Sequence, residues 1–97
     1  MRTALSAFLL AAMCAEAWAV DLPRFDMRLR CASMGDSRGV RACEHSEDAA
    51  RHAILVSWSR YPTRRKNSCV QAEQLRPTGQ RSYVTLSRCL GEPNATG

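Results

Sequence analysis

The chain has 97 residues, a formal net charge of +5 at pH 7 and a hydrophobic share of 45%. This length allows one domain at most. The hydrophobic core of so short a chain stabilises the fold by little more than the conformational entropy that folding costs. We therefore expect disulfides or a bound metal to support the fold.

Residues 1–19 differ in kind from the rest and are typical of a secretory signal peptide. Arg2 supplies a positive start, residues 4–15 are apolar or small apart from Ser6, and Ala17-Trp18-Ala19 is an A-x-A cleavage pattern. The apolar run is shorter than the roughly 20 residues that span a bilayer. We therefore expect a cleaved leader and an exported domain, residues 20–97, that is periplasmic or secreted and has no transmembrane segment.

Three other interpretations of residues 1–19 stay open, and the first is a buried N-terminal helix. Ala15-Glu16-Ala17 has the same small-x-small form, which would move the cleavage site two residues earlier. Cys14 could be the lipid-bearing cysteine of a bacterial lipoprotein, although Met13 stands where a lipobox usually carries Gly or Ala.

The remaining cysteines predict two disulfides. An even number of cysteines in a short exported chain is typical of a disulfide framework, and four come after the leader: Cys31, Cys43, Cys69 and Cys89. Structural zinc is the alternative, but it usually draws cysteine pairs two to four residues apart, a spacing absent here. We therefore expect neither a metal nor a cofactor.

Helical spacing of apolar residues dominates the mature chain, and sustained strand-like alternation is absent. Ala50, Ile54 and Trp58, for example, lie on one helical face. Gly35, Pro62, the Pro77-Thr78-Gly79 turn and Gly91 separate the helices. The four predicted helices are residues 23–34, 38–59, 64–76 and 83–90.

Capping residues precede three of these helices: Asp36 or Ser37, Thr63, and Ser82. The pattern predicts an all-α fold, a small antiparallel arrangement of three to four helices, with a frayed tail at residues 91–97.

Helix geometry selects among the three possible cysteine pairings. Helices joined by short turns run antiparallel, so residues equally far from a turn come level at a rise of about 1.5 Å per residue. Cys69 and Cys89 are level about the Pro77 turn, and Cys31 and Cys43 are level about Gly35. Cys43 and Cys69 miss by roughly 15 Å on the same rise, whereas a disulfide needs Cα atoms within about 7 Å. We predict Cys31–Cys43 and Cys69–Cys89.

Residues 43–90 resemble an uncharacterised family of small exported, disulfide-bonded helical proteins of Gram-negative bacteria. The resemblance rests on a C-x3-E-x2-A-x3-[LI]-x3-W pattern and on several positions C-terminal to it: Cys43, Glu47, Ala50, Ile54, Trp58, then Tyr61, Cys69, Ser82-Tyr83-Val84 and Cys89-Leu90. The resemblance implies a disulfide-bonded helical module and export, and it supplies no activity that carries over to this chain. The chain departs from the family at Thr85, where a Glu would complete a capping box with Ser82, and in its basic residues 64–66.

Catalytic chemistry finds little support in the chain. Glu47 lies in an apolar stripe, where Arg51 at i+4 is positioned to pair with it. His45, Asp48 and His52 share one helix face, but the two histidines start about 10 Å apart and a solvated polar face is expected. No activated nucleophile or phosphate-binding loop is present. We therefore expect a protein that is not an enzyme.

A basic cluster is the most distinctive candidate site: Arg60, Arg64, Arg65 and Lys66. Residues 64–66 occupy a first helical turn, where the helix dipole disfavours cations, so this placement favours an anionic partner. The hypothesis is a binding module that contacts an anionic envelope lipid, polysaccharide or protein. Nucleic acid does not fit the compartment or the lack of interleaved aromatics. The alternative is a small periplasmic stress or chaperone-like protein.

Overall fold

The computed structural model describes residues 20–94; the predicted signal peptide at 1–19, with Cys14, and residues 95–97 lie outside the described part. Four α-helices and two short 3₁₀ turns make up this part, and it contains no strand, so the predicted all-α class is confirmed. The elements are α2 Met27–Cys31, α3 Ser37–Ser57, η1 Trp58–Arg60, α4 Thr63–Gln74, η2 Thr78–Gln80 and α5 Tyr83–Leu90.

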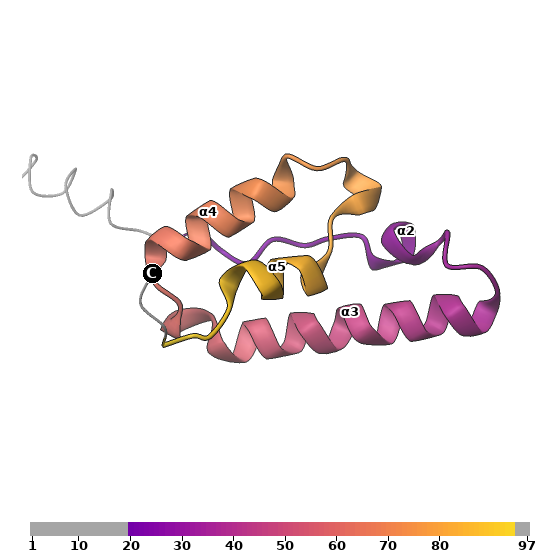
Figure 1. The fold of residues 1–97 in the computed structure, drawn as a ribbon, viewed down its shortest axis with the longest axis horizontal. Helices are drawn as coiled ribbons and strands as arrows, with labels where there is room; N and C mark the ends of the chain where they lie inside the picture. The colour runs from indigo at the N-terminus through magenta and orange to yellow at the C-terminus, as the bar shows by residue number, and fades with distance from the viewer. Residues whose placement is uncertain (1–19, 95–97) are drawn as a thin grey trace, which may run out of the picture.

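The short helix α5 lies between the two longer helices and contacts both of them. Helix α4 runs in the opposite direction to α3 and α5 (Figure 1), which is the predicted antiparallel arrangement. Helix α2 packs on α3 and on η2. An extended segment, residues 20–26, passes alongside these helices before α2 begins.

The core forms around α5. Tyr83, Leu86 and Leu90 recur at i, i+3 and i+7 on that helix and are each at most 2% exposed, so one helical face is fully buried. The other buried members of this core cluster come from α3, α4 and the segments before α2 and α4: Phe25, Ile54, Tyr61, Cys69 and Val70. Removal of such side chains from water is the main stabilising contribution that this small core provides.

Both predicted disulfides are present. Cys31–Cys43 joins α2 to α3 with a Cα–Cα distance of 5.6 Å, and Cys69–Cys89 joins α4 to α5 at 5.7 Å. Each bridge therefore closes a helical hairpin, and together they fix α2 and α4 to the helices beside them. In the chain-entropy account each loop closure stabilises the fold by about 3 kcal/mol.

The prediction of a helix over residues 23–34 was wrong for most of that range. Asp26 caps α2 by accepting from the Leu29 N–H at 3.0 Å, so the helix begins at Met27. The preceding segment is held by long-range bonds instead. The Phe25 N–H donates to the Tyr83 hydroxyl at 2.9 Å, and that hydroxyl donates to the Pro23 carbonyl at 3.1 Å. These bonds satisfy backbone groups that a helix would otherwise have paired.

Two of the three predicted helix caps are confirmed and one is wrong. Asp36 caps α3 through the Gly39 N–H at 2.9 Å, and Ser82 caps α5 through the Thr85 N–H at 3.3 Å, as expected. Thr63 is not a cap, because it is the first residue of α4 and the position before it is Pro62, which gives no side-chain cap bond.

The second helix ends earlier than predicted. Its predicted last turn is the separate 3₁₀ turn η1.

Candidate functional site

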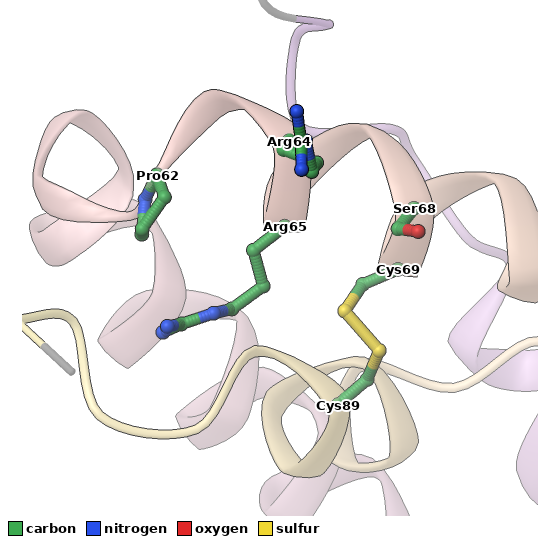
Figure 2. A pocket seen from close by; sticks show the side chains of 6 residues that line it. All are labelled: Pro62, Arg64, Arg65, Ser68, Cys69 and Cys89. Atoms are coloured by element: carbon green, nitrogen blue, oxygen red, sulfur yellow. A yellow bond between two sulfur atoms is a disulfide. The ribbon is translucent and has the colours of Figure 1, made fainter. Parts of the chain in front are cut away.

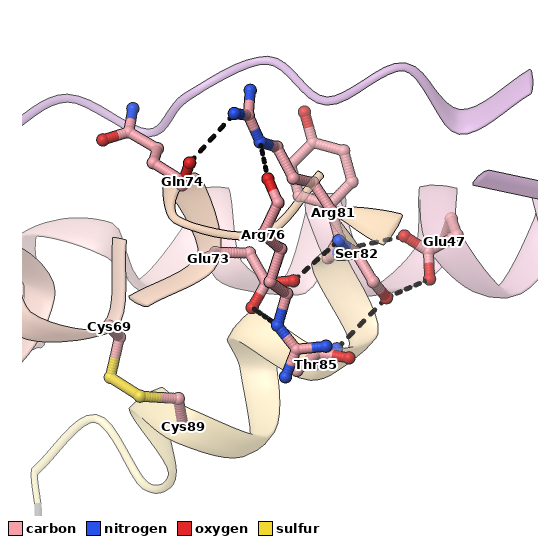
Figure 3. A network of polar contacts seen from close by, with 10 residues as sticks. Glu47, Cys69, Glu73, Gln74, Arg76, Arg81, Ser82, Thr85 and Cys89 are labelled. Carbon is pink, nitrogen blue, oxygen red and sulfur yellow. Dashed lines mark hydrogen bonds and ion pairs between the residues drawn. A yellow bond between two sulfur atoms is a disulfide. The ribbon is translucent and has the colours of Figure 1, made fainter. Parts of the chain in front are cut away.

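Two buried carboxylates from different helices meet at the start of α5 (Figure 3). Glu47 of α3 is 3% exposed and accepts from the Ser82 hydroxyl at 2.6 Å and from the Tyr83 N–H at 2.7 Å. Glu73 of α4 is 2% exposed and accepts from the Ser82 N–H at 2.9 Å. Negative charge at a helix N-terminus is favourable, so this arrangement anchors α5 to both neighbours.

The expected pair between Glu47 and Arg51 is wrong. Arg51 lies 3.9 Å from Asp48 instead, in a pair whose two side chains are largely open to solvent. Glu47 faces α5, where bonds from an N–H and a hydroxyl replace the expected guanidinium. Because both of its oxygens are occupied and it is sealed from solvent, its evident role is to hold α5.

In the same region, Arg81 binds backbone carbonyls at the C-terminal end of α4. The Arg81 side chain donates from Nε to the Arg76 carbonyl at 3.1 Å and from Nη2 to the Gln74 carbonyl at 2.9 Å. Arg76 in turn lies 3.6 Å from the Glu73 carboxylate. A cation on the final carbonyls of a helix is the favourable orientation with respect to its dipole.

The predicted basic cluster divides when its residues are placed in three dimensions. Arg65 points from α4 toward α5 and donates from Nη1 to the carbonyls of Leu90 at 3.0 Å and Glu92 at 2.8 Å. Lys66 is only 7% exposed, and its Nζ lies 5.3 Å from the ring centroid of Trp58, a cation–π contact. Both charges therefore have partners within the fold.

Arg60 and Arg64 are exposed and make no hydrogen bond or ion pair within residues 20–94. Arg64 also lines an open pocket of about 580 Å³ at the start of α4 (Figure 2). The other lining residues are Pro62, Arg65, Ser68, Cys69 and Cys89. Figure 2 shows Arg64 and Arg65 on different sides of the first turn of α4. Of the four predicted residues, Arg60 and Arg64 can thus reach an external anion.

Tyr61 precedes the pocket residue Pro62 in the sequence and packs edge-on against Trp58, with ring centroids 6.4 Å apart. Burial and the Glu92 carboxylate raise the pKa of its phenol above the ordinary value of 10.0, while the Arg65 guanidinium opposes this shift. The neutral hydroxyl is therefore the form that the fold favours.

The histidine face remains a polar surface in the structure. His45, Asp48 and His52 are all exposed on α3. Within residues 20–94, no three His, Cys, Asp or Glu side chains gather as a metal site would require. The same residues contain no helix with both the length and the apolar character needed to cross a bilayer.

Sequence reasoning missed two residues of this region: Glu73, which holds the start of α5, and Arg81, which bonds the carbonyls at the end of α4. Glu73 comes four residues after Cys69, so it lies on the α4 face that turns toward α5. That spacing was the one available signal, and it becomes informative only once the Cys69–Cys89 bridge is assigned.

Comparison with known protein families, with curated proteins and with solved structures gives no match to this chain. The resemblance of residues 43–90 to small exported proteins therefore stays a prediction. What the structure defines is a class of fold: a disulfide-stapled, all-α domain with a capped and buried central helix.

Proposed function

We propose that this protein is an exported, non-enzymatic binding module, and that Arg64 is its contact point for an anionic group of the cell envelope. Export is supported by the signal-like residues 1–19 and by the two disulfides, which fit an oxidising compartment such as the periplasm or the extracellular space. A phosphate or carboxylate, on a lipid or a polysaccharide, is the chemistry that an arginine recognises.

The observation that carries this proposal is the placement of Arg64. It is exposed, has no partner within residues 20–94, and lines a pocket of about 580 Å³. The first intrahelical bond of α4 runs from the Lys66 N–H to the Pro62 carbonyl, and no side chain caps the turn before it. The N–H groups of Thr63 and Arg64 precede that bond, so this turn offers them to an anion beside the Arg64 side chain.

Arg60 adds a second exposed cation, in η1, two residues before Pro62. Arg65 and Lys66 contribute less than the sequence implied, because their charges are already engaged by carbonyls and by the Trp58 ring. The proposed contact is therefore narrow, one arginine at a pocket with a second nearby.

Sedimentation of the oxidised mature protein with vesicles tests this function. Binding to vesicles that contain phosphatidylglycerol should exceed binding to pure phosphatidylcholine vesicles. It should disappear near 1 M salt, where the screening length falls to about 3 Å. Arg64→Ser should weaken it several-fold.

Arg38→Ser is the matched control. Arg38 is also an exposed arginine in the first turn of a helix, α3, and Figure 1 shows that the start of α3 lies far from the start of α4. It should leave binding nearly unchanged. Equal losses in the two variants would show that net charge alone drives adsorption, and would contradict a site at Arg64.

A stress or chaperone-like role is the second candidate, favoured by exposed apolar residues. Leu55 and Val56 are 52% and 60% exposed on α3, and Leu75 is 80% exposed after α4. This role predicts that the purified protein suppresses aggregation of a heat-denatured client, and that the double variant Leu55→Ser, Val56→Ser loses this effect. Activity that survives in the double variant would count against it.

A further inference from the structure

The Cys69–Cys89 disulfide forms part of the pocket wall, and its two halves differ in exposure. Cys89 is exposed, whereas Cys69 is only 3% exposed. The Cys31–Cys43 bridge combines a fully buried Cys31 with a half-buried Cys43 and does not line this pocket. Of these two disulfides, Cys69–Cys89 alone therefore presents an exposed cysteine to this pocket.

The positions of the two cysteines in their helices distinguish them further. Cys89 lies in the last turn of α5, where the helix dipole disfavours a thiolate. Cys69 lies in the middle of α4, away from such an end. In thiol–disulfide exchange, the sulfur that is attacked must be accessible and the other must leave as the thiolate. Accessibility selects Cys89 for attack, which makes Cys69 the leaving group, and the helix dipole at Cys89 opposes the reverse assignment.

The charges at the pocket favour an anionic attacker. Arg64 and Arg65 both line it, and Arg65 is fixed there by its bonds to the carbonyls of Leu90 and Glu92. Fixed cations next to a cysteine stabilise a thiolate, and an accessible cation raises the local concentration of an anionic reactant. A small thiol that also carries carboxylates would therefore react faster here, because the cations stabilise its thiolate and raise its concentration at the pocket.

We propose that this pocket is a site of thiol–disulfide exchange, at which a small carboxylate-bearing thiol attacks Cys89 Sγ. The incoming thiolate forms a new S–S bond to Cys89 while the Cys69–Cys89 bond breaks. The bond's electron pair stays on Cys69 Sγ, which takes a proton from water. One disulfide is consumed and one is formed, so the step needs no other oxidant or reductant.

The anion preference rests on the proposed function of Arg64, whereas the choice of sulfur does not. The product carries the small thiol on α5 and a thiol on α4, and the covalent link between these helices is lost. The carboxylate anchors from Glu47 and Glu73 do not involve the sulfurs and stay in place.

Timed reaction of the oxidised mature protein with glutathione tests the proposal. Samples are quenched with acid, free thiols are alkylated, and peptides are mapped by mass spectrometry. The expected first product carries glutathione on Cys89 and the alkyl label on Cys69, with Cys31–Cys43 intact. Earlier opening of Cys31–Cys43, or a first adduct on Cys69, would overturn the proposal.

The choice of thiol tests the role of charge. Arg64→Ser should slow the reaction with glutathione several-fold and change the reaction with uncharged 2-mercaptoethanol by less than about twofold. Arg38→Ser should affect neither. Equal effects of Arg64→Ser on both thiols would refute selection of a carboxylate-bearing thiol. If the Arg64→Ser and Arg38→Ser effects on exchange are as expected but the protein does not bind anionic vesicles, the proposed function is contradicted and the exchange site is not.

Discussion

Glu73 Oε1 accepts a hydrogen bond from the Ser82 N–H at 2.9 Å, across the turn between α4 and α5. In a capping box, that N–H is satisfied by a Glu or Gln three residues after the cap. Here that position is Thr85, and a carboxylate from the preceding helix takes the role. The start of α5 therefore combines the local bond from the Thr85 N–H to Ser82 with tertiary bonds to Glu47 and Glu73, so its stability depends on α3 and α4 as well.

Thr85→Glu should not stabilise the protein, although the local sequence pattern predicts that it would. The Ser82 N–H already has an acceptor, so a new carboxylate would find no donor there and would add charge beside Glu47 and Glu73. The expected change in the free energy of unfolding lies between zero and a loss of about 1 kcal/mol. Urea unfolding measures it, and a clear gain would contradict this view of the cap.

The same substitution should become favourable once Glu73 is removed. Glu73→Ala leaves the Ser82 N–H without its acceptor and should cost about 2 kcal/mol. Adding Thr85→Glu to that variant should recover about 1 kcal/mol through a local capping box. A double-mutant cycle over the four proteins isolates this coupling, and strictly additive effects would exclude it.

Glu47→Ala should be among the most damaging single substitutions. It leaves the buried Tyr83 N–H and Ser82 hydroxyl without their acceptor and should lower the free energy of unfolding by about 3 kcal/mol. Glu47→Gln keeps one acceptor oxygen and should lower it by less than half of that. Glu44→Ala is the control, because Glu44 lies one turn earlier on α3 with no bond of this kind. Thermal and urea unfolding of the three variants test the order, and equal losses at positions 44 and 47 would refute it.

The two disulfides should contribute comparable stability. Cys31–Cys43 and Cys69–Cys89 span 12 and 20 residues, so each paired change to serine should lower the free energy of unfolding by about 3 kcal/mol. Removal of both should leave the chain largely unfolded at 37 °C, since domains of this size are marginally stable. Circular dichroism with thermal unfolding measures this. A cooperative transition unchanged in the cysteine-free protein would show that the core suffices alone.

Stability should fall in alkaline solution partly through Tyr61. Burial raises the pKa of its phenol, so the unfolded chain loses this proton near pH 10.0 while the folded protein still retains it. The stabilising contribution is complete below that pH and is lost as the pH rises through the higher folded value. Tyr61→Phe should flatten this decline above about pH 10. An identical pH dependence in the variant would contradict the assignment.

The features that sequence predicted well are those fixed by local spacing. The helix bounds of α5, the Asp36 and Ser82 caps and both disulfide pairings agree with turn signals and helical rise. The features that it missed depend on contacts between distant segments. Pro23 suits a helix start and Phe25 has helical spacing with Leu29, but the Tyr83 hydroxyl, 58 to 60 residues away in sequence, holds both in an extended segment.

The basic cluster shows the same limit for the candidate site. Residues 64–66 of this cluster are adjacent in sequence, and helical geometry turns consecutive side chains about 100° apart. Arg65 and Lys66 therefore turn toward α5 and Trp58, and Arg64 turns toward solvent. Only the positions of the partners decide which cation is available, and sequence alone does not give those positions.

Intact-mass measurement of the protein isolated from its native cells, combined with peptide mapping without reduction, is the decisive test of export and of covalent support. We expect a chain that begins at Val20, has no free thiol, and yields crosslinked peptides joining Cys31 to Cys43 and Cys69 to Cys89. An uncut N-terminus with four alkylatable cysteines would contradict both the export and the covalent support on which the fold and the proposed site depend.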